Sequence, residues 1–181
     1  MEASLKGEIE RALAPLLGRA VWGAGRDRAS LWLQLGERIE RRVEPDTARD
    51  VGEYSLHVSC AWRLIGPEGI HVASGDMFTP ADPDGDLEDF DWDTPGASWC
   101  DVRLAQFIDA TADSPRAVSG VSADELGSVR LFLGDDFVFE VFPDSSHAGH
   151  VESEFWRLLH PADGSPHVVV GSYGLDRIHE A

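Results

Sequence analysis

A Trp-Arg-Leu motif that occurs once in each half of the chain places two arginines where they can do chemistry. It spans Trp62–Leu64 and Trp156–Leu158. Successive side chains of a strand point to opposite faces, so both tryptophans are expected in the core and Arg63 and Arg157 on the other face. There a guanidinium can pair with a carboxylate of a neighbouring strand or grip the carboxylate of a ligand. The carboxylates considered as partners are Glu53, Glu140 and Glu154.

A histidine follows each motif, His71 in the first half and His167 in the second. If a ligand-binding cleft lies between the halves, we expect Arg63, Arg157, His71 and His167 to contribute to it. The alternative for the two histidines is a structural role, because matched positions on matched strands share the same geometry. For the arginines the alternative is pairing with carboxylates of the protein itself.

An acidic stretch offers oxygen ligands of the kind that calcium prefers. Asp82, Asp84 and Asp86 alternate, and Asp93 is the twelfth residue counted from Asp82. An EF-hand loop needs Gly at its sixth position and normally Glu at its twelfth, but the sixth residue here is Leu87. We therefore expect a solvated loop rather than a calcium site.

His147 and His150 have the spacing of metal ligands and lie close to two glutamates in the sequence. No HExxH or Cys/His motif accompanies them, and such loop histidines are common in proteins without a metal. Together with the alternating aspartates they are weak candidates for a metal site. No cofactor is expected.

The sequence contains no recognisable motif for nucleophilic or phosphate-binding chemistry. It has no GxSxG segment, and neither Cys60 nor Cys100 belongs to a Cys/His signature. The pair Gly23 and Gly25 lacks the third glycine of a dinucleotide loop and the lysine of a P-loop. We expect a non-enzymatic protein, and a metal-dependent enzyme ranks last among the hypotheses.

The two halves of the chain repeat one another. The segment Arg19–Gly23, RAVWG, recurs as RAVSG at Arg116–Gly120, 97 positions later. Further blocks follow in the same order at offsets of 94 to 98: Leu31–Gly36 with Val129–Gly134, Val43–Asp46 with Val141–Asp144, Trp62–Pro67 with Trp156–Pro161, and His71–Val72 with His167–Val168. Five collinear blocks predict an internal duplication.

Each half reads as one helix followed by short strands. Apolar residues at helical spacing predict helices at about 3–17 and 101–111, the second with Asp101 in a capping position. Period-two alternation and Gly or Pro turns predict the strands. These strands are expected near 19–24, 30–35, 38–44, 53–65 and 70–75, and near 116–121, 128–133, 136–142, 152–159 and 166–172. The connections are too short for helical crossovers, so the pairing should be antiparallel.

We predict an α+β, β-rich fold with a pseudo-twofold arrangement of two helix-plus-meander repeats. The first repeat is assigned to residues 1–76 and the second to 101–181, and the two are expected to form one compact domain. Residues 77–100 form an acidic linker loop between them. Three aromatic residues are expected to dock this loop on the body: Phe90, Trp92 and Trp99.

Composition argues against several classes of partner. The net charge is −18, from 33 acidic and 15 basic residues, and such a surface repels nucleic-acid phosphates and anionic lipids. Residues 1–17 read as an amphipathic helix without the features of a signal peptide, and no run of about 18 apolar residues is long enough to span a membrane. Two isolated cysteines suggest free thiols rather than a disulfide framework. A cytoplasmic location is therefore expected.

The chain resembles uncharacterised hypothetical proteins of actinobacteria in its Arg-Ala-Val and Trp-Arg-Leu motifs and in the stretch Ser74–Asp82. This resemblance implies no activity. The leading hypothesis is an intracellular interaction protein whose acidic surface steers a basic partner, as an immunity protein neutralises a toxin domain. The alternative is a small-ligand-binding domain with its site between the two repeats.

Overall fold

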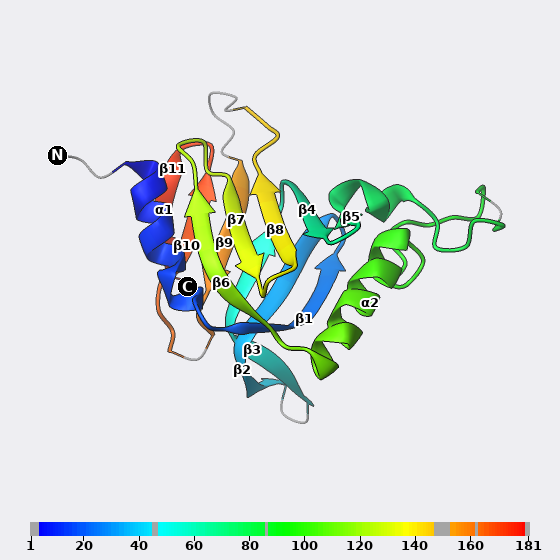
Figure 1. Ribbon diagram of the computed structural model, residues 1–181, viewed down its shortest axis with the longest axis horizontal. Coiled ribbons are helices and arrows are strands. Elements are labelled where there is room, and N and C mark those ends of the chain that lie inside the picture. The colour runs from blue at the N-terminus through cyan, green and yellow to red at the C-terminus, as the bar shows by residue number, and fades with distance from the viewer. Residues whose placement is uncertain (1–3, 45–46, 86, 147–152, 162, 180–181) are drawn as a thin grey trace.

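The computed structural model describes residues 4–44, 47–85, 87–146, 153–161 and 163–179 (Figure 1). Within these residues the chain forms one eleven-stranded sheet, two α-helices and two 3-10 helices, and all pairings between strands are antiparallel. The predicted α+β, β-rich class is confirmed. In chain order the elements are α1 (Leu5–Leu13), η1 (Ala14–Leu16), β1 (Ala20–Asp27), β2 (Ser30–Glu44), β3 (Thr47–Val58), β4 (Ala61–Gly66), β5 (Gly69–Ala73), η2 (Ser74–Phe78), α2 (Trp99–Asp113), β6 (Arg116–Ala123), β7 (Val129–Leu133), β8 (Phe137–Phe142), β9 (Glu154–Leu159), β10 (His167–Gly171) and β11 (Gly174–Ile178).

The strand order interleaves the beginning and the end of the chain. It runs β11-β10-β9-β3-β2-β1-β6-β7-β8-β4-β5. Strands β4 and β5 therefore join the sheet beside β8, whereas β9 and β10 join it beside β3. Near the centre β1 meets β6 through only two residue pairs, Ala20 with Ala117 and Val21 with Arg116.

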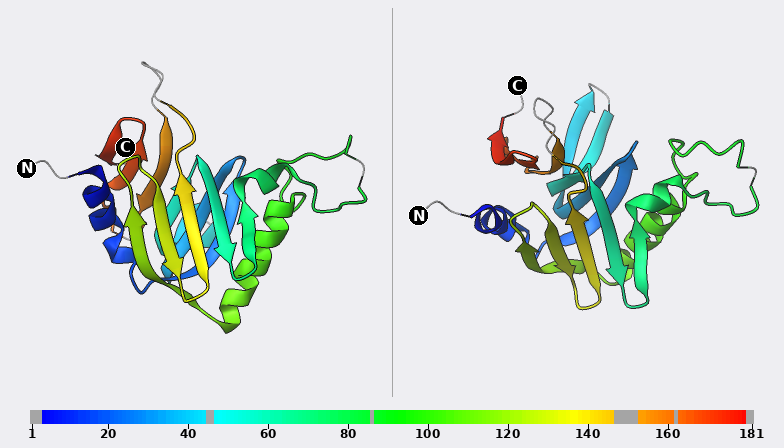
Figure 2. Two further views of the ribbon diagram at one scale, coloured as in Figure 1. Left: turned by 45° about the horizontal axis from the view of Figure 1, so that its top comes forward. Right: turned by 90° about the horizontal axis from the view of Figure 1, so that it is seen from above.

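The sheet folds back on itself around this short central contact. In Figure 1 strands β6, β7 and β8 form the front layer, with β9, β3 and β2 behind them, and the view from above in Figure 2 separates the two layers. The helices lie at opposite sides: α1 contacts β6 and β11, and α2 contacts β1, β5 and η2. Neither helix, at nine and fifteen residues, has the length and apolar character to cross a lipid bilayer.

The core lies between the two layers, where both contribute their inward-facing side chains. Trp62 and Trp156 are each only 1% exposed, which confirms the expectation that both face the core. Alternating residues of the facing strands pack around them: Leu31, Leu33 and Leu35 from β2, Leu56 and Val58 from β3, Val129, Leu131 and Leu133 from β7, and Phe139 and Val141 from β8. Ile9, Leu13, Leu104 and Phe107 of the helices complete this core.

Local capping explains where both helices begin. Ser4 precedes α1, and its side chain accepts a hydrogen bond from the amide of Gly7. Ser98 precedes α2 and forms a capping box with Asp101, each side chain accepting from the other residue's backbone N–H. The prediction that Asp101 caps this helix was wrong by three residues, because the serine of an S-x-x-D pattern takes the cap position and the aspartate lies in the first turn.

Two predicted strand boundaries were also wrong. The segments 30–35 and 38–44 form one strand, β2, which continues past Gly36 at a positive φ of 79° and a bulge before Arg38. The segment 53–65 is split between β3 and β4 at residues 59–60. Alternation could not reveal this break, because Val58 and Trp62 on either side of it both face the core. Strand β11 was not predicted.

Candidate functional site

The most conspicuous surface feature is an acidic arm, which we define as residues 79–98. Seven carboxylates and no cationic residue occur in this stretch of the sequence. The arm extends away from the body beyond α2 (Figure 1). Its two ends are held together by backbone hydrogen bonds, from Ala81 N to Ala97 O at 2.8 Å and from Trp99 N to Thr79 O at 2.7 Å.

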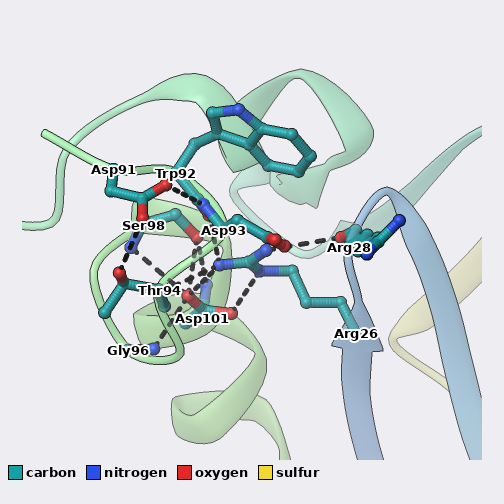
Figure 3. A network of polar contacts seen from close by, with 9 residues as sticks. All are labelled: Arg26, Arg28, Asp91, Trp92, Asp93, Thr94, Gly96, Ser98 and Asp101. Atoms are coloured by element: carbon teal, nitrogen blue, oxygen red, sulfur yellow. Dashed lines mark hydrogen bonds and ion pairs between the residues drawn. The ribbon is translucent and has the colours of Figure 1, made fainter.

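Arg26 of β1 anchors the arm to the sheet (Figure 3). Its guanidinium donates two hydrogen bonds to the carboxylate of Asp101, Nε to Oδ1 at 2.7 Å and Nη2 to Oδ2 at 2.9 Å. The same Nη2 also donates to the carbonyls of Trp92 at 2.6 Å and Thr94 at 3.2 Å, both within the arm. Only 4% of the Arg26 side chain is exposed, so this cation is used inside the protein to position the arm.

The Asp101 carboxylate links the anchor, the arm and the helix. Besides Arg26, it accepts hydrogen bonds from the amide of Gly96 at 3.0 Å and from the hydroxyl of Ser98 at 2.9 Å. Burial opposes its ionisation, but the hydrogen bonds from Arg26 and Ser98 outweigh that effect and hold the pKa of Asp101 below its ordinary value. The same pairing raises the pKa of Arg26. The anchor is therefore a charged pair at neutral pH.

Aromatic contacts add to the anchor at the base of the arm. The ring of Trp92 packs against that of Phe78, with ring centroids 5.2 Å apart. Phe78 nevertheless remains 58% exposed, and Leu87 near the tip is 73% exposed. Trp99 lies at the start of α2 with the guanidinium of Arg103 over its ring. The arm and the elements at its base thus combine carboxylates with exposed apolar side chains.

A second feature is a pocket of about 260 Å³ on the outer face of β6, β7, β8 and β4. We call it the arginine pocket, and its lining residues are Arg63, Ser122, Ala123, Asp124, Ser128, Val129, Arg130, Glu140, Val141 and Phe142. Glu140 lies at its centre between two arginines, with Oε2 at 2.6 Å from Arg63 Nε and Oε1 at 2.7 Å from Arg130 Nε. Of the carboxylates considered as partners for Arg63, Glu140 is the one that it contacts.

The structure does not bring the four predicted ligand-binding residues together. Arg157 lies on β9, with six strands between it and the strand of Arg63 in the sheet order, and pairs with Glu154 of its own strand at 2.5 to 2.6 Å. His167 is buried on β10.

His71 on β5 is occupied by a contact with α2. Its backbone carbonyl accepts from Arg103 Nε at 2.9 Å, and its ring contacts the carbonyl and the Nη2 of the same arginine at 3.1 and 3.0 Å. Burial lowers the pKa of the His71 imidazole. These contacts connect β5 to α2, and they engage both ring nitrogens of His71 within the protein.

Of the weak metal candidates, Asp82 and Asp84 lie in the acidic arm, where an Asp82 side-chain oxygen accepts a hydrogen bond from the amide of Asp84 at 3.0 Å. The other three, Asp86, His147 and His150, lie outside the described residues. Within the described ranges, no group of three or more His, Cys, Asp or Glu side chains is arranged to hold a metal ion.

The anchoring and pocket residues were largely missed from the sequence. Arg26 and Asp101 are 75 residues apart, and no local pattern connects them. The Ser98-x-x-Asp101 capping box was a readable signal for the start of α2. Arg130 was also readable as an outward residue, because it alternates with Val129 and Leu131. The contact between Arg130 and Glu140 could not be predicted, because it depends on how β7 pairs with β8.

Comparisons with models of known protein families, with curated proteins and with solved structures find no match for this chain. Its functional interpretation therefore rests on the geometry of these two surface features.

Proposed function

We propose that the chain is a non-enzymatic intracellular interaction protein whose acidic arm binds a basic protein partner. The observation that carries this proposal is the Arg26 anchor, a buried cation committed to holding the base of a highly charged loop. A solvated loop that served only for solubility would not need such an anchor. Positioning the carboxylates before binding lowers the entropy that association would otherwise cost.

Charge and apolar exposure both favour a protein as the partner. The arm contains seven of the carboxylates that make the net charge −18, and a surface of this kind speeds the encounter with a positively charged partner. Leu87 and Phe78 add exposed apolar area beside the carboxylates. Protein interfaces combine an apolar centre with a charged rim, whereas a small cation would use only the charges.

The cysteines are in keeping with an intracellular location. Cys60 and Cys100 are both free and buried, and burial raises the pKa of each thiol to about 12. Such thiols are protonated and unreactive, which suits a reducing compartment.

The test is co-purification from the source organism at low and at high salt, followed by calorimetry with the captured partner. The arm variant carries Asp84→Asn, Glu88→Gln, Asp89→Asn and Asp93→Asn. The matched control removes the same four charges from exposed sites elsewhere: Glu37→Gln, Glu40→Gln, Asp50→Asn and Asp113→Asn. We expect the arm variant to weaken binding at low salt by about tenfold or more, since four rim charges are lost together.

The control should bind nearly as well as the wild type, because its altered charges lie off the arm. A partner that both variants bind equally, or that high salt does not release, would refute the proposal.

We also infer that the two halves derive from one duplicated unit. The strand order supports this inference, because β1-β2-β3-β9-β10 on one side of the β1–β6 contact corresponds to β6-β7-β8-β4-β5 on the other, with β11 as an additional edge strand. Each first strand has a bulge at the matched position, after Val21 in β1 and after Val118 in β6. Each helix contacts the first strand of the opposite half, α1 with β6 and α2 with β1.

One of the five sequence matches does not fit this equivalence. Val43 lies in β2, whereas Val141 lies in β8. By pairing, the counterpart of Val141 is Val58: Val141 pairs with Val129 and Trp62, and Val58 pairs with Leu31 and Trp156. Under the duplication, the nearly constant offset results from two compensating insertions, a longer β2–β3 hairpin in the first half and a longer β8–β9 connection in the second.

A further inference from the structure

Four polar residues form a single row across four neighbouring strands. In the registered pairs of the sheet, Ser122 of β6 faces Arg130 of β7, Arg130 faces Glu140 of β8, and Glu140 faces Arg63 of β4. The sequence neighbours of the three charged residues are buried in the core: Trp62, Leu64, Val129, Leu131, Phe139 and Val141. The row therefore lies on the outer face of the sheet, and it forms the floor of the arginine pocket.

The two arginines share one carboxylate, which leaves hydrogen-bonding capacity unused. Burial opposes ionisation of Glu140, but the hydrogen bonds from Arg63 and Arg130 outweigh it, so its pKa lies below the ordinary value. Each guanidinium uses only its Nε on Glu140. Among the described residues, no hydrogen-bond partner is found for the terminal Nη atoms of Arg63 or Arg130. The Arg63 side chain is 39% exposed and the Arg130 side chain 61%.

The other carboxylate of the pocket is already engaged. Asp124 accepts hydrogen bonds from the amides of Leu126 and Ser128, both at 2.9 Å, and these bonds help to keep its pKa low despite partial burial. The Ser128 hydroxyl is also hydrogen-bonded to Asp124, so the donors that remain in the pocket are the Nη groups of the two arginines and the hydroxyl of Ser122. This is a donor-rich hollow on a protein whose net charge is −18.

One wall of the pocket is apolar. Phe142 is 38% exposed, and the guanidinium of Arg63 lies over its ring at 5.5 Å. A volume of about 260 Å³ lies just below the usual range of ligand pockets, so the occupant must be a small molecule.

The corresponding row on the other layer does not reproduce this arrangement. There Gly25 faces Trp32, Trp32 faces His57, and His57 faces Arg157. Tryptophan thus takes the place of the second arginine, and Arg157 is paired with Glu154 of its own strand. Arg157 therefore serves as a matched control for Arg63.

We propose that the arginine pocket binds a small organic acid with an apolar body, a site separate from the partner-binding arm. The carboxylate accepts from the Nη groups of Arg63 and Arg130, and the apolar body packs on Phe142. A planar guanidinium matches a carboxylate in geometry, and two of them, on the strands β7 and β4 that flank β8, fix its orientation.

The test is calorimetric titration of the whole protein with benzoate, its neutral isostere benzamide, and inorganic phosphate. Benzoate should bind, and benzamide and phosphate should bind at least about tenfold more weakly, since one lacks the charge and the other lacks the apolar body. Arg63→Gln and Arg130→Gln should each weaken benzoate binding at least about tenfold, whereas Arg157→Gln should leave it unchanged.

Circular dichroism and thermal unfolding verify that each variant is folded. The Arg130 side chain is more exposed than that of Arg63, so Arg130→Gln can still test the proposal if Arg63→Gln does not fold. Equal binding of benzoate and benzamide, no detectable benzoate binding by the wild type, or equal losses in Arg130→Gln and Arg157→Gln would overturn the proposal. The four-charge arm variant should bind benzoate like the wild type, so this result and that of the partner test are independent.

Discussion

Arg26 and Asp101, which lie 75 residues apart in the chain, form an ion pair through two hydrogen bonds of 2.7 and 2.9 Å. Arg26 comes from β1 and Asp101 from the first turn of α2. The pair joins a strand near the centre of the sheet to the helix and to the base of the acidic arm. It therefore connects the stability of the fold with the presentation of the arm.

Replacing Arg26 by Ala should release the arm and destabilise the protein. The substitution leaves the partly buried Asp101 carboxylate without its cation and removes the donor to Trp92 and Thr94, so the free energy of unfolding should fall by about 3 kcal/mol. Urea unfolding measures this change, and hydrogen exchange should show faster exchange in the arm. The control is Arg41→Ala on an exposed site, which should change stability by less than about 0.5 kcal/mol. Equal effects of both substitutions would contradict the anchoring role.

The contribution of the anchor should depend on pH. The pKa of Asp101 in the folded protein is below its ordinary value of 3.8, so the pair contributes stability that is fully present above about pH 5 and is lost as the pH falls through the folded-state pKa. Asp101→Asn should therefore be less stable than the wild type at neutral pH, and the difference should shrink towards pH 3. Urea unfolding between pH 3 and pH 7 measures it, and a difference that stays constant over this range would count against the ion pair.

The two core tryptophans should differ in their response to substitution. The indole N–H of Trp156 donates to the carbonyl of Gly127 at 2.9 Å, whereas that of Trp62 is buried and has no hydrogen-bond partner among the described residues. Trp156→Phe removes a hydrogen bond and leaves a carbonyl without its donor. It should destabilise the protein by about 1 kcal/mol more than Trp62→Phe. Urea midpoints at unchanged slope give the comparison, and a larger loss for Trp62→Phe would refute it.

Glycine at position 25 is required by the tryptophan that covers it. A Cβ atom there would lie 2.8 Å from Cε2 of Trp32 on the neighbouring strand, so Gly25→Ala should displace the ring and cost about 1–3 kcal/mol. Gly75→Ala is the matched control, because a Cβ at that position meets no atom within 4 Å. Thermal unfolding together with Trp fluorescence measures both stability and ring displacement. Unchanged fluorescence and stability in Gly25→Ala would show that the position of the Trp32 ring does not require a glycine at position 25.

Most of the local structure could be predicted from the sequence, because it depends on interactions between near neighbours. Alternation placed Trp62 and Trp156 in the core, and turn residues placed most hairpins. The acidic stretch was recognisable from composition alone. The predicted strand boundaries were close to the observed ones where a turn residue marks the break. They were wrong where the apolar alternation continues across the break, as between Val58 and Trp62.

Pairing of distant strands was decided only by the tertiary structure. No local pattern states that β4 joins β8 or that β9 joins β3, because every strand edge offers the same backbone donors and acceptors. That choice brings Arg63 beside Glu140 and Arg130, and it separates Arg63 from Arg157, its counterpart in sequence. The sequence by itself determined which side chains face inward and where charge accumulates. The tertiary structure decided which of the outward-facing residues meet, because burying both inward faces in one core selects the strand order, and the strand order selects the neighbours.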